Sequence, residues 1–587
     1  MLYIQQKAFI TKILTYLCLY KSIGDSIVLD IIWIIVLVVF AIWWFVIADL
    51  DKAGILAKYN ITTMGPLIMV RTFRGQKLLD WIAKPRWFWK SMINVGIPII
   101  LLIMILMGIL TFGMALIMII NLSNVPAPSA VNAPQNILAI PGVNQFIPLV
   151  WGWVALIIAM VVHEFGHAIL AKVDNIKVKS LGLLLIPVPI GAFAEIDEEE
   201  LFGTKSEGGT SDVLGPMDTK AAGAGKRKAS SMAFIRILSA GVLINLIVAI
   251  LAFALLFGPV MGSIAATDSG VYAYGVTTGS IADNAGLKEN TRLTTIDGQS
   301  ITDANMLNAY IRANPNKDLA LAGVYDGKPV QYTLHNGDSN GAYVILVTNT
   351  SGMPGAAAGI TTNMRIVAIN GTSIATQAAF MDYMNTTVPG QMITVTAMDG
   401  AAKKDYPITL AADPTGVQHK GFIGVTTSDN SLGFLAYQFD AQAYLDGLNS
   451  MPSSIGGWFR IIMMPVLEFT QVDQGYNVFH GPYASQFHVT GWLAPLGSGT
   501  IYNLVDCLFW IAWLNFNISI CNCLPIIPFD GGHILREVMR VITSRFVKNE
   551  ETVEKISKAV VSAFSITLFA SIIFMFVAPY ITQWFLR

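Results

Sequence analysis

Six segments of the sequence are each long and apolar enough to cross a lipid bilayer, and they constrain the fold more than any other feature. A membrane-spanning helix needs about 20 predominantly apolar residues. Only 13% of the residues are charged, about half the share in an ordinary soluble domain. The sequence therefore predicts an α-helical polytopic membrane protein. The predicted spans are 27–48, 92–120, 148–171, 232–260, 500–524 and 558–585.

The distribution of Lys and Arg between these spans predicts the orientation of the chain. Loop 49–91 is rich in both residues, whereas loop 121–147 contains neither. Because cytoplasmic loops carry an excess of positive charge, loop 49–91 is predicted to be cytoplasmic. We expect a multi-pass protein of the cell membrane. Alternation of the spans predicts the remaining locations: 172–231 and 533–557 inside, 261–499 and residues 1–25 outside, the last as a surface helix or an over-long start.

Charge and cysteine content exclude two other classes of protein. The 37 basic and 38 acidic residues nearly cancel, so nothing indicates a nucleic-acid partner. The four cysteines lie mostly in apolar segments and form no paired framework, which argues against a disulfide scaffold. The first apolar run is too long for a signal peptide. The expected surroundings are therefore the lipid bilayer itself.

The third predicted span carries the pattern His163-Glu164-Phe165-Gly166-His167. Residues four apart lie on one face of a helix, so the two imidazoles can grip one Zn²⁺ while Glu164 acts as a general base. The pattern also arises by chance in long chains. In a lipid-embedded helix that explanation is weaker, because each ionisable group there costs about 2.5 kcal/mol or more and needs a partner. The sequence favours a zinc site near the cytoplasmic end of this span.

A third zinc ligand is expected at the end of the fifth span. Pro525 and Pro528 break the helix there, and Asp530 follows at the same membrane depth as the histidines. Gly531 and Gly532 are expected to give the sharp backbone geometry that aims the carboxylate inward. His533 is a rival ligand, but it lies three residues further into the basic loop. We therefore expect His163, His167 and Asp530 as ligands.

These two motifs together resemble the site-2 protease family of intramembrane zinc metalloproteases. The second motif is Asn522-Cys523-Leu524-Pro525 followed by Asp530-Gly531. The resemblance covers about 148–260 and 500–587. It implies His163, His167 and Asp530 as zinc ligands and Glu164 as the base. It further implies that Asn522 contacts the substrate or the developing oxyanion, a role that suits its amide donor.

Two further stretches are expected near the site. In "SAGVLINL", Val242 stands where the family has proline, so Asn245 has two open interpretations: a substrate contact or an interhelical hydrogen bond. Residues 176–197 resemble the family's re-entrant β-hairpin, whose edge could pair with an unwound substrate segment. Gly191 and Phe193 of this hairpin are predicted to contact the substrate. A simple surface hairpin is the alternative.

Residues 264–430 contain an internal repeat at a spacing of 73. Ala285-Gly286-Leu287 matches Ala358-Gly359-Ile360, and Ile296-Asp297-Gly298 matches Ile369-Asn370-Gly371. The pattern resembles protease-associated PDZ domains, so we expect two in tandem. Their expected role is either to bind peptides or proteins by strand addition or to exclude bulky substrates. Gly275–Thr278 recurs as Gly424–Thr427, which suggests a pair of edge strands.

The combined prediction is a membrane zinc endopeptidase that cleaves transmembrane segments of single-span membrane proteins. The alternative is a catalytically silent scaffold that binds partners through its PDZ-like domains. A zinc transporter would need polar groups across the whole bilayer, whereas here they gather at one end. The expected domains are 1–145 with two spans, 146–262 as the first catalytic part, 264–340 and 341–430 as PDZ-like domains, 431–499 as a linker with an interfacial helix at 454–469, and 500–587 as the second catalytic part.

Overall fold

The computed structural model describes most of the chain between residues 27 and 585. The prediction for residues 1–25 lies outside the described residues. The chain divides into two compact units: one combines 1–253, 471–475 and 509–587, and the other combines 254–470 and 476–508. The gaps in the description are 74, 123–124, 126–127, 129, 187, 198–228, 267–269, 326, 338–340, 348–352, 400–401, 413–419, 429–430, 468–477, 480–483 and 485.

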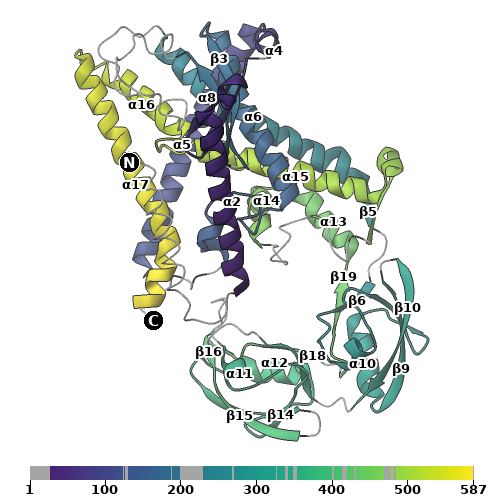
Figure 1. The fold of residues 1–587 in the computed structure, drawn as a ribbon. Coiled ribbons are helices and arrows are strands. Elements are labelled where there is room, and N and C mark those ends of the chain that lie inside the picture. Colours follow the sequence, from purple (N-terminus) through teal and green to yellow (C-terminus); the bar gives the residue numbers. More distant parts are fainter. Residues whose placement is uncertain are drawn as a thin grey trace. The chain divides into compact units, whose positions relative to one another are not determined.

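Long apolar helices dominate the first unit (Figure 1). Among the described residues, five helices are long and apolar enough to cross a membrane: α5 (Arg86–Ile120), α6 (Leu149–Val173), the continuous helical stretch Ser231–Ser263 that begins with α8 (Ser231–Leu255), α15 (Ser498–Asn522), and Glu550–Gln583 within α17 (Glu550–Phe585). The predicted span 27–48 falls in α2 (Ile27–Lys52), which is helical but is not one of these five. The count of six spans is therefore not confirmed.

The faces of these helices differ in burial according to their position in the unit. Half of the most apolar window is buried in α6 and in α8, but only 22% in α5 and 17% in α17. The last two helices leave large apolar side chains exposed, as helices facing lipid do. The core of the unit is formed where α6 and α8 pack closely, since a Cβ on Gly166 would lie 2.8 Å from the Ala240 carbonyl oxygen.

A four-stranded antiparallel sheet lies beside these helices, and its strand order is β1-β2-β3-β4. Strands β3 (Val178–Ile186) and β4 (Val188–Ile196) form the predicted hairpin over 176–197. Strands β1 (Ile61–Met64) and β2 (Leu67–Thr72) come from the loop 49–91, in which no strand is predicted from the sequence. They turn at Gly65-Pro66, with a positive φ of 66° at Gly65, and β2 pairs with β3. Among the described residues, β1 and β4 are the two edge strands of this sheet.

The second unit contains two sheets with the same topology, as the internal repeat predicts. One has the order β10-β9-β7-β6-β19 and the other β15-β14-β12-β11-β18. Positive φ angles recur at matching positions of the repeat, at Asn290 and Asn363 and at Asp297 and Asn370. The strands are β6 (Gly270–Tyr274), β7 (Arg292–Ile296), β9 (Lys317–Tyr325), β10 (Lys328–Asn336), β11 (Ala342–Val347), β12 (Arg365–Ile369), β14 (Met392–Asp399), β15 (Ala402–Thr409), β18 (Val425–Ser428) and β19 (Leu435–Phe439).

Strand pairing corrects two predictions for this unit. Strand β19 lies in the predicted linker 431–499, yet it pairs with β6 and completes the first sheet, so the second PDZ-like domain is inserted into the first. Strand β18 pairs with β11, so Gly275–Thr278 and Gly424–Thr427 are not a strand pair. The helix predicted at 454–469 is present as α14 (Ile455–Leu467).

Candidate metal centre

Helix α6 places His163 and His167 one turn apart on its buried face. His163 is 9% exposed and His167 is 2% exposed. Their rings meet nearly at right angles, with centroids 4.7 Å apart, and their Nε2 atoms are 3.1 Å apart. Both rings therefore direct the same nitrogen toward one point.

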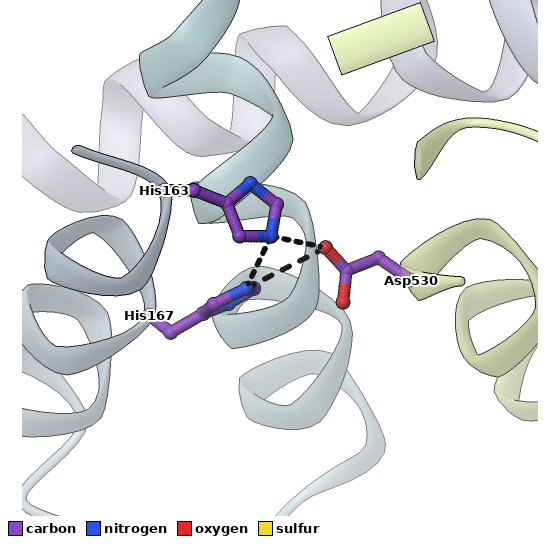
Figure 2. Close-up of side chains that lie close together, drawn as sticks. All are labelled: His163, His167 and Asp530. Carbon is purple, nitrogen blue, oxygen red and sulfur yellow. Dashed lines mark hydrogen bonds and ion pairs between the residues drawn. The ribbon is translucent and has the colours of Figure 1, made fainter. Parts of the chain in front are cut away.

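Asp530 reaches this point from the other half of the sequence. Helix α15 ends at Asn522, the turn contains Pro525 and Pro528, and α16 (Asp530–Thr543) begins with the aspartate itself. Asp530 Oδ2 lies 3.0 Å from His163 Nε2 and 3.5 Å from His167 Nε2. Figure 2 shows the three side chains pointing toward one another. The group contains Asp530 and not its rival His533.

Gly531 and Gly532 serve close packing rather than a special backbone angle. Neither has a positive φ. A Cβ on Gly531 would lie 2.5 Å from the carbonyl oxygens of Cys523 and Leu524, and one on Gly532 would lie 2.6 Å from the carbonyl carbon of Ile526. The expected sharp turn is therefore replaced by a tight contact between the start of α16 and the turn before it.

The donor set fits a zinc ion. One ligand atom from each of the three residues lies within 4.8 Å of the other two, and all three residues are buried. Two nitrogens and one carboxylate oxygen form a set that zinc accepts, and a catalytic site keeps its fourth position open. Two Nε2 atoms facing each other at 3.1 Å cannot both be protonated, and a cation between them satisfies both lone pairs.

Glu164 follows His163 on α6 and contacts the sheet. Its Oε2 accepts a hydrogen bond from the backbone N–H of Ala194, at 2.9 Å. Ala194 lies on β4, the last strand of the sheet. Asp197, three residues further on, directs its own N–H to Lys177, on the β3 side. The edge of β4 that no described strand covers therefore faces the predicted general base.

Helix α8 forms the wall behind both imidazoles. The Ile237 carbonyl oxygen lies 2.7 Å from His167 Nδ1, and Asn245 Nδ2 lies 3.4 Å from His163 Nδ1. Between them, a Cβ on Gly241 would lie 2.6 Å from His167 Nε2 and 2.8 Å from His163 Cε1. No motif in the sequence marks Ile237, Gly241 or Ala194, although the spacing of four between Gly241 and Asn245 places both on one face of the helix.

Four further residues are predicted from the sequence to contact the substrate. Asn522 donates through Nδ2 to the Ile518 carbonyl oxygen of its own helix, at 3.1 Å, so one of the two N–H donors of its amide is engaged within α15. Gly191 and Phe193 lie on β4, the strand that carries Ala194. Asn245 is fully buried beside His163. Contacts of these four residues with a substrate stay predictions.

The family model of peptidase family M50 matches residues 151–568, which is more than half of the chain and includes both motifs. The chain belongs to peptidase family M50. The predicted resemblance to site-2 proteases is thereby confirmed. With its apolar helices, this M50 chain is a multi-pass membrane protein.

Known proteins resemble this M50 chain over different shares of its length. An uncharacterized protein of Methanocaldococcus jannaschii is 31% identical over 31% of this chain, and the match spans about half (47%) of that protein. The regulator of sigma E protease of Haemophilus influenzae is 23% identical over 71% of this chain and 96% of its own length. A Neisseria meningitidis protein with zinc metalloprotease in its name is 24% identical over 65% of this chain and 88% of its own.

A solved structure also resembles part of the chain. The PDZ domain of an SdrC-like protein from Listeria monocytogenes is 26% identical, covers 15% of this chain and 90% of that domain, and has a TM-score of 0.14.

Proposed function

We propose that this chain is an intramembrane zinc endopeptidase that hydrolyses a peptide bond in a transmembrane segment of a single-span membrane protein. The observation that supports it is the convergence of His163, His167 and Asp530 within 4.8 Å, next to an intact Glu164. We further propose that the site faces the cytoplasm, because the basic loops on that side flank the spans that carry it.

The three buried residues would hold the zinc ion, and Glu164 would move protons. When bound, zinc would polarise the scissile carbonyl and lower the pKa of a water molecule, so that this water can lose a proton and attack the carbonyl. Glu164 would accept the proton of that water and pass it to the leaving amine. Asn522 would donate to the developing oxyanion with the second N–H of its amide, since the first bonds the Ile518 carbonyl.

Strand β4 would hold the substrate in an extended form. A helical peptide bond hides its carbonyl group, so the substrate must unwind before water can attack. An extended segment can add to an open strand edge through main-chain hydrogen bonds. Because backbone groups two residues apart point to the same side of a strand, Ala192 would offer its N–H on the edge where Ala194 meets Glu164. Gly191 and Phe193 would flank the bound segment.

The test uses detergent-purified protein and a single-span model substrate. We expect cleavage by the parent protein, loss of cleavage in Glu164→Gln by a factor of about 10² or more, and loss on chelation that added zinc reverses. Glu551→Gln is the matched control, because Glu551 is exposed and pairs with Lys555 on α17. Cleavage by Glu164→Gln at the parental rate would refute the mechanism, and absence of cleavage in all proteins would favour the scaffold.

A further inference from the structure

The two imidazoles are held from behind in different ways. His167 Nδ1 lies 2.7 Å from the Ile237 carbonyl oxygen, which can only accept a hydrogen bond. This contact fixes a proton on Nδ1, and the neutral ring then carries its lone pair on Nε2, the form that binds a metal. His163 Nδ1 instead faces the side-chain amide of Asn245, which has both a donor and an acceptor.

The Asn245 amide is buried and half-satisfied. The residue is fully buried, and its Oδ1 has no hydrogen-bond partner among the residues that the structure describes. Its Nδ2 points at His163 Nδ1 from 3.4 Å, which requires Nδ1 to be the acceptor and places the imidazole proton on Nε2, which faces His167 Nε2 at 3.1 Å. That arrangement suits the site without a metal ion.

A metal ion at His163 Nε2 reverses these roles. The proton then lies on Nδ1, and two N–H groups would face each other. A half turn of the amide exchanges its nitrogen and oxygen in nearly the same volume. It would place Oδ1 on Nδ1–H and end the repulsion between the two N–H groups.

We propose that Asn245 is a positioning residue that holds His163 in the zinc-binding tautomer by accepting a hydrogen bond from Nδ1. This inference rests on the proposed zinc site. It gives Asn245 a contact with the metal ligand His163 instead of a contact with the substrate. Asn suits this role because its amide can serve both states of His163. The backbone carbonyl of Ile237 serves only one state of His167.

The test measures zinc affinity without turnover, in the Glu164→Gln background, by competition with chelators of graded strength. We expect Asn245→Leu, which keeps the volume but loses the acceptor, to bind zinc about 10–100-fold more weakly. Asn245→Asp keeps an acceptor and is expected to bind at least as tightly as the background protein. The cobalt-substituted proteins supply a second readout, because the visible absorption of Co²⁺ reports the ligand geometry.

Asn515→Leu is the matched control. Asn515 is equally buried, and its amide bonds to the Ile511 carbonyl of its own helix. Equal zinc affinity in Asn245→Leu and the background protein, or an equal loss in Asn515→Leu, would overturn the inference. If Asn245→Leu does not fold, a tenfold loss in folded Asn245→Asp would overturn it, and retained affinity would support it. Absence of zinc binding in the background protein itself would refute the proposed function instead.

Discussion

The backbone N–H of Ala194 donates a hydrogen bond to the Glu164 carboxylate at 2.9 Å, and thereby joins the edge of a sheet to the proposed catalytic base. Ala194 is 4% exposed and lies opposite Leu181 of β3, on the side of β4 that faces away from Glu164. A carboxylate held by a backbone donor is restricted in its rotamers, so this contact fixes the direction in which Glu164 reaches. The position of the Glu164 carboxylate therefore depends on the position of strand β4.

Replacing Ala194 with proline removes this donor, because proline has no N–H. We expect Ala194→Pro to cleave the model substrate roughly 10–100-fold more slowly, since small misplacements of a catalytic group have effects of this size. Zinc content is expected to stay at the parental level, because the three ligands come from other elements. Ala194→Gly keeps the N–H and serves as the control. Equal rates for the proline and glycine variants would show that the contact has no role.

Gly241 leaves room for both imidazoles, so we expect Gly241→Ala to weaken zinc binding by about tenfold or more. The added Cβ would lie 2.6 Å from His167 Nε2 and 2.8 Å from His163 Cε1, and both rings are confined by helix α8. Competition with a chelator measures the effect. Gly113→Ala on α5 is the control, because a Cβ there meets no atom within 4 Å. A zinc affinity of Gly241→Ala equal to that of the parent protein would contradict this prediction, and would show that α6 and α8 move apart to accommodate the added methyl group.

The sequence predicts the site better than the elements around it. His163 and His167 are four residues apart on one helix, so their shared face follows from helical geometry alone. The broken helix around Pro525 and Pro528 likewise identifies Asp530. The wall on α8 is different, because the contact between Ile237 and His167 joins positions 70 residues apart and involves a carbonyl that every residue has.

Strand pairing over long separations is the part of the fold that the sequence hides. The stretch 61–72 lies in a basic loop, and its charges predict only its side of the membrane. This stretch is held as a strand because Leu67–Thr72 pairs with β3, which is distant in the sequence. The pairing of β19 with β6 joins positions on either side of a whole PDZ-like domain, so an apparent linker belongs to the first sheet.

The matched turns of the two PDZ-like domains differ in one charge. Hydrogen bonds from Lys317, Ala320 and Tyr310 hold the pKa of the Asp297 carboxyl below its ordinary value, with the Lys317 ammonium as the main cause. A pKa depressed by folding stabilises the fold above the unfolded pKa, about 3.9, and this contribution is lost as pH falls through the folded value. At the matching position of the second domain, Asn370 donates to the Tyr383 hydroxyl and accepts from the Thr394 N–H without a charge.

We therefore expect the first PDZ-like domain of the full-length protein to lose protease resistance more steeply than the second as pH falls below about 4. In Asp297→Asn the difference should shrink, because the acceptor remains but no group titrates at this position. Pepsin digestion across this pH range, with the cut sites located by mass spectrometry, measures resistance in each domain. The same acid loss in the parent protein and in Asp297→Asn would contradict the assignment.

Gly182 is where the hairpin β1–β2, which lies outside the family match, joins the sheet beside the metal centre. A Cβ at this position would clash with the ring of Phe193 on β4 and with the backbone carbonyl oxygen of Val70 on β2. The ring can rotate away, but the carbonyl belongs to the strand itself. We therefore expect Gly182→Ala to push β2 off β3.

Cysteines introduced at Val70 and Leu183, which are paired across β2 and β3, measure this separation in a background without native cysteines. We expect oxidation to link them efficiently in the parent protein and several-fold less in Gly182→Ala. The control is Gly113→Ala on α5, where an added Cβ meets no described atom within 4 Å. Since β4 depends on β3 for its position, substrate cleavage should fall together with cross-linking. Undiminished cross-linking in Gly182→Ala would show that the hairpin tolerates the added methyl group and that Gly182 does not secure the sheet.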